Sequence, residues 1–221
     1  MTYRASLPQP LSGSRGLKFL VRCVALLLCG ALLTACGQLL SGHVYTELPT
    51  LKPGNYRLDP HHTTVLFKVE HLGISSFVGR FNQSQATLNF VDSDPAASTI
   101  VADVEINSLD VNRPDFAQTL VSCDWLCSEE HPVARFQSRG RANVDGSLLI
   151  FAGDLTFRGV TNPATLAVTI NGATTNRLTG DYTLGFEAKL EFLRSRFGMD
   201  KFIPAVGDNV QIEVFAEFIR Q

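Results

Sequence analysis

The chain has 221 residues, which is enough for one domain with a sizeable core. Its 19 basic residues stand against 21 acidic ones, so the formal net charge is −2. This balance excludes the strongly positive surface that nucleic-acid-binding proteins use, and it does not favour anionic ligands.

The first 35 residues have the pattern of a signal peptide. Every charged residue among them is basic, and an apolar run covers residues 23–33. This run is too short to span a bilayer as an ordinary helix, which favours a cleaved export signal. Residues 33–36, Leu-Thr-Ala-Cys, resemble the bacterial lipoprotein box. The resemblance implies that Cys36 becomes the lipid-modified first residue, and plain secretion with cleavage nearby is the alternative.

Residues 36–54 show no sustained hydrophobic period and contain Pro49 and Pro53. They are predicted to form a tether between the lipidated Cys36 and the folded domain. The residue after Cys36 is Gly37 and not an aspartate. This resembles the signal that sorts lipoproteins of Gram-negative bacteria to the outer rather than the inner membrane. We therefore expect the protein at the periplasmic face of the cell envelope.

From residue 55 onward, apolar and polar residues alternate repeatedly, with turn residues between the segments. Such alternation predicts strands with one buried and one solvated face. About eight strands in an antiparallel meander favour an all-β closed barrel, with a sandwich as the alternative. The alternating segments are residues 63–71, 77–81, 86–90, 100–106, 148–157, 164–170, 181–192 and 210–218.

The interval from residue 112 to residue 132 breaks this pattern. Phe116, Leu120 and Cys123 follow one another at helical spacing. Pro114 suits a first helical turn and Pro132 would end a helix. One short helical excursion is therefore predicted between two strands of the barrel.

Small and aromatic residues are mixed on the inward phase of the predicted strands, as Ala188 beside Phe186 illustrates. This mixture suits the walls of an internal cavity, and it equally suits a filled barrel in which small residues fit the taper. The pattern alone leaves both interpretations open.

Three motifs follow one another between residues 55 and 221. They are Asp59, His62, Val65, Phe67, Val69, His71, Leu72, Gly73, Gly79 and Phe81, then residues 153–163, then Arg194, Ser195, Phe197, Gly198, Met199, Val206, Gly207 and Asp208. These motifs resemble those of the YceI-like proteins, and the resemblance covers residues 55–221. It implies a lipocalin-like antiparallel barrel with an internal tunnel that binds a polyisoprenoid, a quinone-type or another long-chain lipid, and no established catalytic reaction. The function that the resemblance implies is sequestration or transport of such a lipid by a non-enzyme.

Candidate ligand contacts combine inward apolar residues with a few polar groups for the lipid head. For His62 and His71, a structural hydrogen bond is favoured over contact with the lipid head. Their odd separation puts them on opposite faces of a regular strand, which argues against a joint metal site. For Arg158 the alternative is a salt bridge such as one with Asp154. The full set is Val65, Phe67, Val69, His62, His71, Phe81, Phe90, Arg158, Tyr182, Leu184, Phe186 and Ala188.

Cys123 and Cys127 form a second candidate site. In an exported protein, two cysteines four apart favour a disulfide. His131 continues the spacing, so a soft-metal site of Cys123, Cys127 and His131 is an alternative, as is a free redox pair. A redox or metal-handling accessory protein is accordingly the second function. No other cofactor is expected, and monomer and homodimer are both left open.

Overall fold

The computed structural model describes Cys23 and residues 42–221. The signal peptide apart from Cys23, and the anchor at Cys36, lie outside these residues. Within the described part, no helix is long and apolar enough to cross a membrane. One antiparallel sheet contains eleven strands: β1 (Gly54–His71), β2 (Ser75–Phe81), β3 (Ser84–Phe90), β4 (Thr99–Glu105), β5 (Leu109–Asp110), β6 (Val133–Ser138), β7 (Asn143–Asp145), β8 (Leu148–Phe157), β9 (Val160–Thr175), β10 (Tyr182–Leu193) and β11 (Val206–Arg220).

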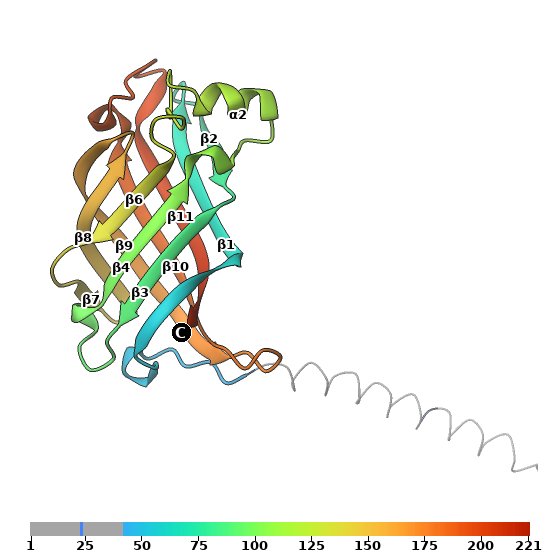
Figure 1. Cartoon of the computed structure of the whole chain (residues 1–221), viewed down its shortest axis with the longest axis vertical. Coiled ribbons are helices and arrows are strands. Elements are labelled where there is room, and N and C mark those ends of the chain that lie inside the picture. Colours follow the sequence, from blue (N-terminus) through green and yellow to red (C-terminus); the bar gives the residue numbers. More distant parts are fainter. Residues whose placement is uncertain (1–22, 24–41) are drawn as a thin grey trace, which may run out of the picture. The chain divides into compact units, whose positions relative to one another are not determined.

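The sheet closes into a barrel because β11 pairs with β10 on one side and with β1 on the other (Figure 1). Two short strands, β2 and β3, share the remaining edge of the long strand β1: Val65 pairs with Phe81, and Tyr56 pairs with Leu88. The ring therefore has eight positions, namely β1, β2 with β3, β4, β6, β8, β9, β10 and β11. This confirms the predicted closed barrel of about eight strands.

The strand β10 shows why these residues form a barrel wall. Its side chains alternate between buried and more exposed positions, with Leu184, Phe186 and Ala188 on the buried face. On β11 the inward Phe218 pairs with Leu184, whereas the out-of-phase Phe215 is exposed. A single buried face fixes the register, because a slip of one residue would move every apolar side chain into water.

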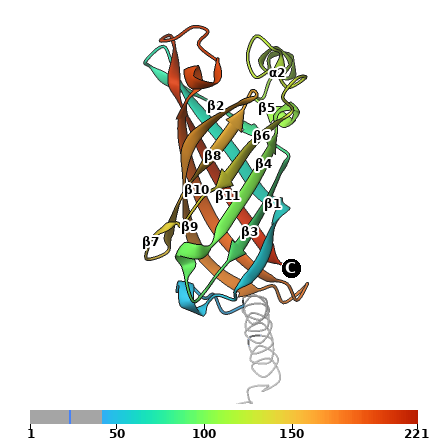
Figure 2. The ribbon, with the colours of Figure 1, turned by 60° about the vertical axis from the view of Figure 1, so that its left-hand side comes forward.

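The predicted helical excursion is α2 (Pro114–Val121), which Pro114 begins as expected. Its buried Ala117 packs with Leu109 and Val111 in a small second core. The helix is shorter than the interval suggested: residues 122–132 form turns, and Pro132 directly precedes β6. Figure 2 shows α2 above the upper end of the barrel.

Several element bounds differ from the alternation in the sequence. The strand β6 was not predicted, because its only deeply buried residue is Phe136 and one such residue gives no period. The strand predicted over 100–106 ends at Glu105, since Ile106 opens the short 3-10 helix η3 (Ile106–Ser108). Long strands such as β1 and β9 extend beyond their clearly alternating parts.

The segment that precedes β1 is part of the folded unit rather than a tether. Tyr45 and Ala173 exchange two backbone hydrogen bonds of 2.8 and 2.7 Å. The short 3-10 helix η1 (Leu48–Thr50) follows, and Leu48 and Leu51 are 6% and 2% exposed within the main core. The compact unit therefore begins at His43, and any tether that follows Cys36 is shorter than predicted.

Candidate functional site

The barrel encloses a cavity of about 600 Å³. Its walls are mainly inward-facing apolar side chains from β1, β4, β10 and β11, and α2 adds Phe116 and Leu120. Small residues do border this space, as Ala86, Ala102 and Ala188 show. In this part of the barrel, the inward-facing alanines and phenylalanines therefore line a cavity and do not fill a solid core.

One end of the barrel is closed by packed side chains. Tyr56, Phe90, Phe151 and Leu184 are almost fully buried there, and Leu51 from the segment before β1 covers them. The Tyr56 hydroxyl donates to the Lys52 carbonyl, and burial raises the pKa of Tyr56. This end contains a solid core, so the cavity occupies only part of the barrel's length.

The cavity reaches the surface at the other end, beside the turn between β1 and β2. His71, Ser75 and Ser76 line the cavity and are exposed, and His71 pairs with Ser75 across the two strands. A second group of polar lining residues, Ser84, Gln85 and Asp103, lies along β3 and β4.

Arg194 is the most deeply buried charged residue in the lining, at 2% exposure. Its guanidinium donates four hydrogen bonds of 2.8–3.0 Å, to the carbonyls of Gly207, Met199, Lys201 and Val206. Burial lowers the pKa of Arg194, while the nearby charges of Asp208 and Asp200 oppose that change. A guanidinium stays protonated in proteins, so Arg194 remains cationic and its four hydrogen bonds hold the segment before β11 in place. The sequence motif around Arg194 is thus explained by local structure.

The structure brings seven of the predicted ligand contacts together in the cavity wall. They are Val65, Phe67, Val69, His71, Phe81, Phe186 and Ala188. The Phe67 ring lies close against Gly79 of β2: a Cβ at Gly79 would lie 2.6 Å from Cζ of that ring. The glycine in the first motif therefore shapes the cavity wall.

The other five predicted contacts lie away from this cavity. Phe90, Tyr182 and Leu184 have the inward phase that was predicted, but they belong to the packed core of the closed end. His62 and Arg158 make structural interactions elsewhere. Alternation shows which face a side chain occupies but not its depth along the barrel axis. For this reason the sequence could not show that Phe90, Tyr182 and Leu184 lie beyond the cavity.

His62 points outward, where β1 changes register between Leu58 and Thr63. Its side chain is 63% exposed, and Nδ1 lies 2.8 Å from Oδ2 of Asp59. The hydrogen bond between them raises the pKa of His62 and lowers that of Asp59. Together with Glu217, these residues offer three potential metal-ligand atoms within 4.8 Å on the outer surface. His62 and His71 do face opposite sides, as predicted.

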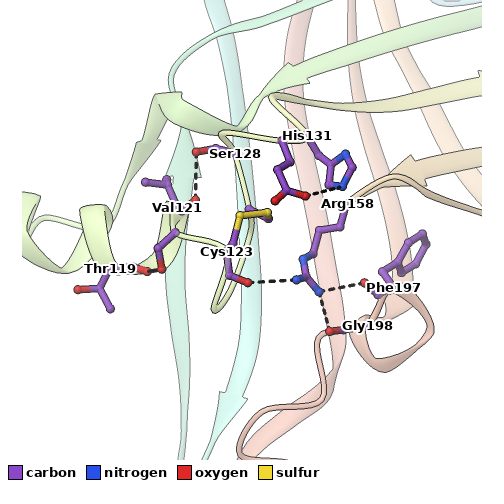
Figure 3. The surroundings of a disulfide bond; sticks show 11 residues. Thr119, Val121, Cys123, Ser128, His131, Arg158, Phe197 and Gly198 are labelled. Carbon is purple, nitrogen blue, oxygen red and sulfur yellow. Dashed lines mark hydrogen bonds and ion pairs between the residues drawn. A yellow bond between two sulfur atoms is a disulfide. The ribbon is translucent and has the colours of Figure 1, made fainter.

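Arg158 joins two loops at the open end of the barrel (Figure 3). It donates to the carbonyl oxygens of Phe197, Gly198 and Cys123, at 3.2, 2.6 and 3.3 Å. The alternative salt bridge with Asp154 was wrong, because that carboxylate pairs with Arg139 at 2.7 Å across the neighbouring strand.

Cys123 and Cys127 form a disulfide, as the sequence predicted (Figure 3). The bonded sulfurs are not thiolate ligands in this state. His131 is directed to the turn between β8 and β9, where its ring covers Gly159 so closely that a Cβ would lie 2.6 Å from it. The third potential ligand near the sulfurs is Glu130 instead of His131, so the predicted three-residue metal set is not assembled.

Sequence reasoning did not single out, as ligand contacts, the apolar lining residues that lie in loops. Trp125 and Leu126 lie between the two cysteines, and Met199 and Phe202 lie in the segment before β11. Their positions in loops carry no hydrophobic period, so only their apolar character in otherwise polar turns could have marked them.

Comparison with known proteins gives consistent relatives. A family model described as a YceI-like domain matches residues 56–218. A UPF0312 protein of Shewanella denitrificans is 30% identical over 177 residues, which is 79% of this chain and 92% of that protein. Protein YceI of Escherichia coli O157:H7 is 30% identical over 169 residues, covering 76% of this chain and 87% of that protein.

Solved structures support the same fold. BcnA of Burkholderia cenocepacia superimposes with a TM-score of 0.65 at 22% identity, covering 72% of this chain and 98% of that one. A polyisoprenoid binding domain from Saccharophagus degradans, implicated in plant cell wall breakdown, gives 0.58 at 11% identity, covering 77% and 100%. At these identities the likeness concerns the fold alone.

Proposed function

The chain belongs to the YceI-like family, and from this premise we propose that it is a binding protein, without catalysis, that sequesters or carries an isoprenoid or similar long-chain lipid. The cavity of about 600 Å³ is the observation that carries the proposal. Its size lies within the roughly 300–1,000 Å³ range of small-molecule sites. The polyisoprenoid binding domain among its structural neighbours supports the same ligand class.

The physical basis is the transfer of hydrocarbon from water into the cavity. Each methylene that leaves water contributes about 0.8 kcal/mol, so a long chain is held without any directional contact. The walls at Val65, Phe186 and Ala188 would contact the chain. A head with hydrogen-bonding groups fits the exposed end, where His71, Ser75 and Ser76 line the cavity. A quinone-type head would use the same donors.

The lipid content of the isolated protein tests this function. The full chain would be produced in a Gram-negative host, purified, and extracted with organic solvent for mass spectrometry. We expect a long-chain, predominantly apolar molecule, whose mass separates an isoprenoid from a quinone or an acyl lipid. Acyl groups attached covalently at Cys36 would stay with the protein. An extract no richer than that of an unrelated lipoprotein, purified identically, would overturn the proposal.

We propose further that the protein is exported and held by a lipid on Cys36, at the periplasmic face of the outer membrane. The supporting observations are the basic and apolar leader and the Leu-Thr-Ala-Cys sequence at residues 33–36. Cys36→Ser removes the acceptor thiol and should move the protein from the membrane fraction to the soluble envelope fraction. Retention of the variant in the membrane fraction would contradict this anchor.

A further inference from the structure

We propose that the five-residue loop closed by the Cys123–Cys127 disulfide is a redox-controlled gate of the barrel cavity. As a gate for a lipid, it rests on the proposed function. The motion of the loop itself can be measured without any ligand.

The disulfide encloses part of the cavity wall. The three residues between the cysteines include Trp125 and Leu126, and both line the cavity. Phe116 and Leu120 of the preceding helix α2 line it as well. A change in the shape of this small loop therefore changes the wall directly.

A second loop meets the disulfide loop from the opposite side. It is the segment of residues 194–203, which contributes Met199 and Phe202 to the same cavity. The Trp125 and Phe202 rings lie with centroids 6.0 Å apart. Lys201 Nζ lies 3.1 Å from Oδ2 of Asp124 and 5.7 Å from the Trp125 ring centroid. The two loops thus touch through exposed, non-covalent contacts at the open end of the barrel.

Arg158 reinforces this junction by donating to the carbonyl of Cys123 on one side and to those of Phe197 and Gly198 on the other (Figure 3). The hydrogen bond from Arg158 to the Cys123 carbonyl depends on where the Cys123 backbone lies. The disulfide fixes that position, because it links Cys123 to the buried Cys127.

The two halves of the loop are held very differently. Backbone donors of Leu126, Cys127 and Ser128 bond to carbonyls of Leu120, Ser122 and Val121, at 3.0, 2.9 and 2.9 Å. Cys123 and Asp124 are exposed, and neither has a comparable anchor to α2 among the described contacts. Once the disulfide is reduced, this half keeps one backbone hydrogen bond, from Trp125 to the Ser122 carbonyl at 2.9 Å, and its contacts with Arg158, Lys201 and Phe202.

Backbone strain gathers at the same place. Five non-glycine residues have positive φ in the part of the chain that the structure describes, and three of them are Cys127, Arg158 and Phe202. Left-handed backbone in such residues persists only where surrounding contacts impose it, and it is common in switch regions. Loss of the covalent link removes one of the constraints that hold Cys127 in this conformation.

The switching step is thiol–disulfide exchange with a dithiol reductant. A thiolate of the reductant attacks Sγ of the exposed Cys123, and the Cys127 sulfur leaves as a thiolate that takes up a proton. The second thiol of the reductant then displaces Cys123 from the mixed disulfide. Two electrons pass to the protein, which gains two thiols, and the reductant becomes a disulfide.

Trp125 is the only tryptophan of the chain, so its fluorescence reports on the gate alone. The full chain would be measured oxidised and after reduction with dithiothreitol, with a thiol count to verify reduction. We expect reduction to shift the emission to longer wavelength and to raise acrylamide quenching at least twofold. The variant in which both cysteines are replaced by serine should show the emission and quenching of the reduced protein, and dithiothreitol should not change them. Unchanged quenching after verified reduction overturns the proposal, whether or not the protein binds lipid.

Release of retinol, a fluorescent isoprenoid alcohol, tests the consequence of this motion. We expect release to become at least threefold faster in the reduced protein, while its circular dichroism spectrum stays unchanged. Equal release rates in both states would overturn the gate even if Trp125 responds. Failure of retinol to bind in either state would count against the lipid function, and the Trp125 response would then decide the loop motion by itself.

Discussion

At the scale of single residues, the cavity wall depends on a small residue that lets large side chains approach the backbone closely. Gly79 is the clearest case, because the Phe67 ring and the Val111 side chain occupy the space where a Cβ would be, with Val111 Cγ1 at 2.8 Å. The sequence marked Gly79 only as a motif glycine. Its physical role became visible through the cross-strand pairing of Gly79 with Phe67.

Gly79→Ala should therefore displace the Phe67 ring and destabilise the protein by about 1–3 kcal/mol, as overpacking does. Gly185→Ala is the matched control, since the nearest heavy atom to its Cβ is a carbonyl oxygen at 4.0 Å and its φ is not positive. The control should change stability by no more than about 1 kcal/mol, with stabilisation favoured. Urea denaturation measures both, and equal effects would contradict this account of the cavity wall.

The predicted ligand contacts show how far single residues could be interpreted from sequence. Phe186 and Leu184 share one inward phase on β10, yet only Phe186 borders the cavity. Whether an inward side chain borders the cavity depends on which segments close each end of the barrel. Those closing segments lie outside the strands, so the alternation does not reveal them. Arg158 was singled out for its turn setting, but its three carbonyl partners come from loops that no sequence period connects.

At the scale of elements, the long strands were predictable and the short ones were not. The strand β10 carries a full alternation over its length, whereas β6 has six residues and one deeply buried side chain. The segment with η1 was expected to be a tether because it contains two prolines and no period. Its fold depends on tertiary contacts, since Leu48 and Leu51 are buried by residues far along the chain.

Leu51→Ala tests whether this segment belongs to the folded unit. Removing a buried leucine side chain usually costs about 2–5 kcal/mol, and Leu51 is 2% exposed. Leu178→Ala, at a side chain that is 80% exposed, should change stability by less than about 0.5 kcal/mol. Thermal unfolding of the two variants provides the comparison. If Leu51→Ala unfolds like the Leu178 control, the segment does not close the barrel end.

At the scale of the whole molecule, the barrel has a packed end and a hollow end. The chain enters the folded unit at the packed end, through residues 43–51, while α2 and the disulfide loop lie at the hollow end (Figure 1). The number of strands favoured a closed barrel, with a sandwich as the alternative, and the pairing of β11 with β1 closes the ring of eight positions. The sequence left open whether the interior is filled or hollow. The structure shows a filled interior at one end of the barrel and a cavity at the other.

The central claim is that a long-chain lipid occupies the hollow end, and cavity filling tests it at one site. Ala188→Phe adds a ring inside the cavity, and Lys189→Phe adds the same ring at the neighbouring exposed position of β10. Native mass spectrometry of each protein as isolated counts the bound lipid. We predict one long-chain lipid on the wild type and on Lys189→Phe, and at least tenfold lower occupancy on Ala188→Phe when all three remain folded. Equal occupancy of the two variants, or a wild type without lipid, would contradict the account.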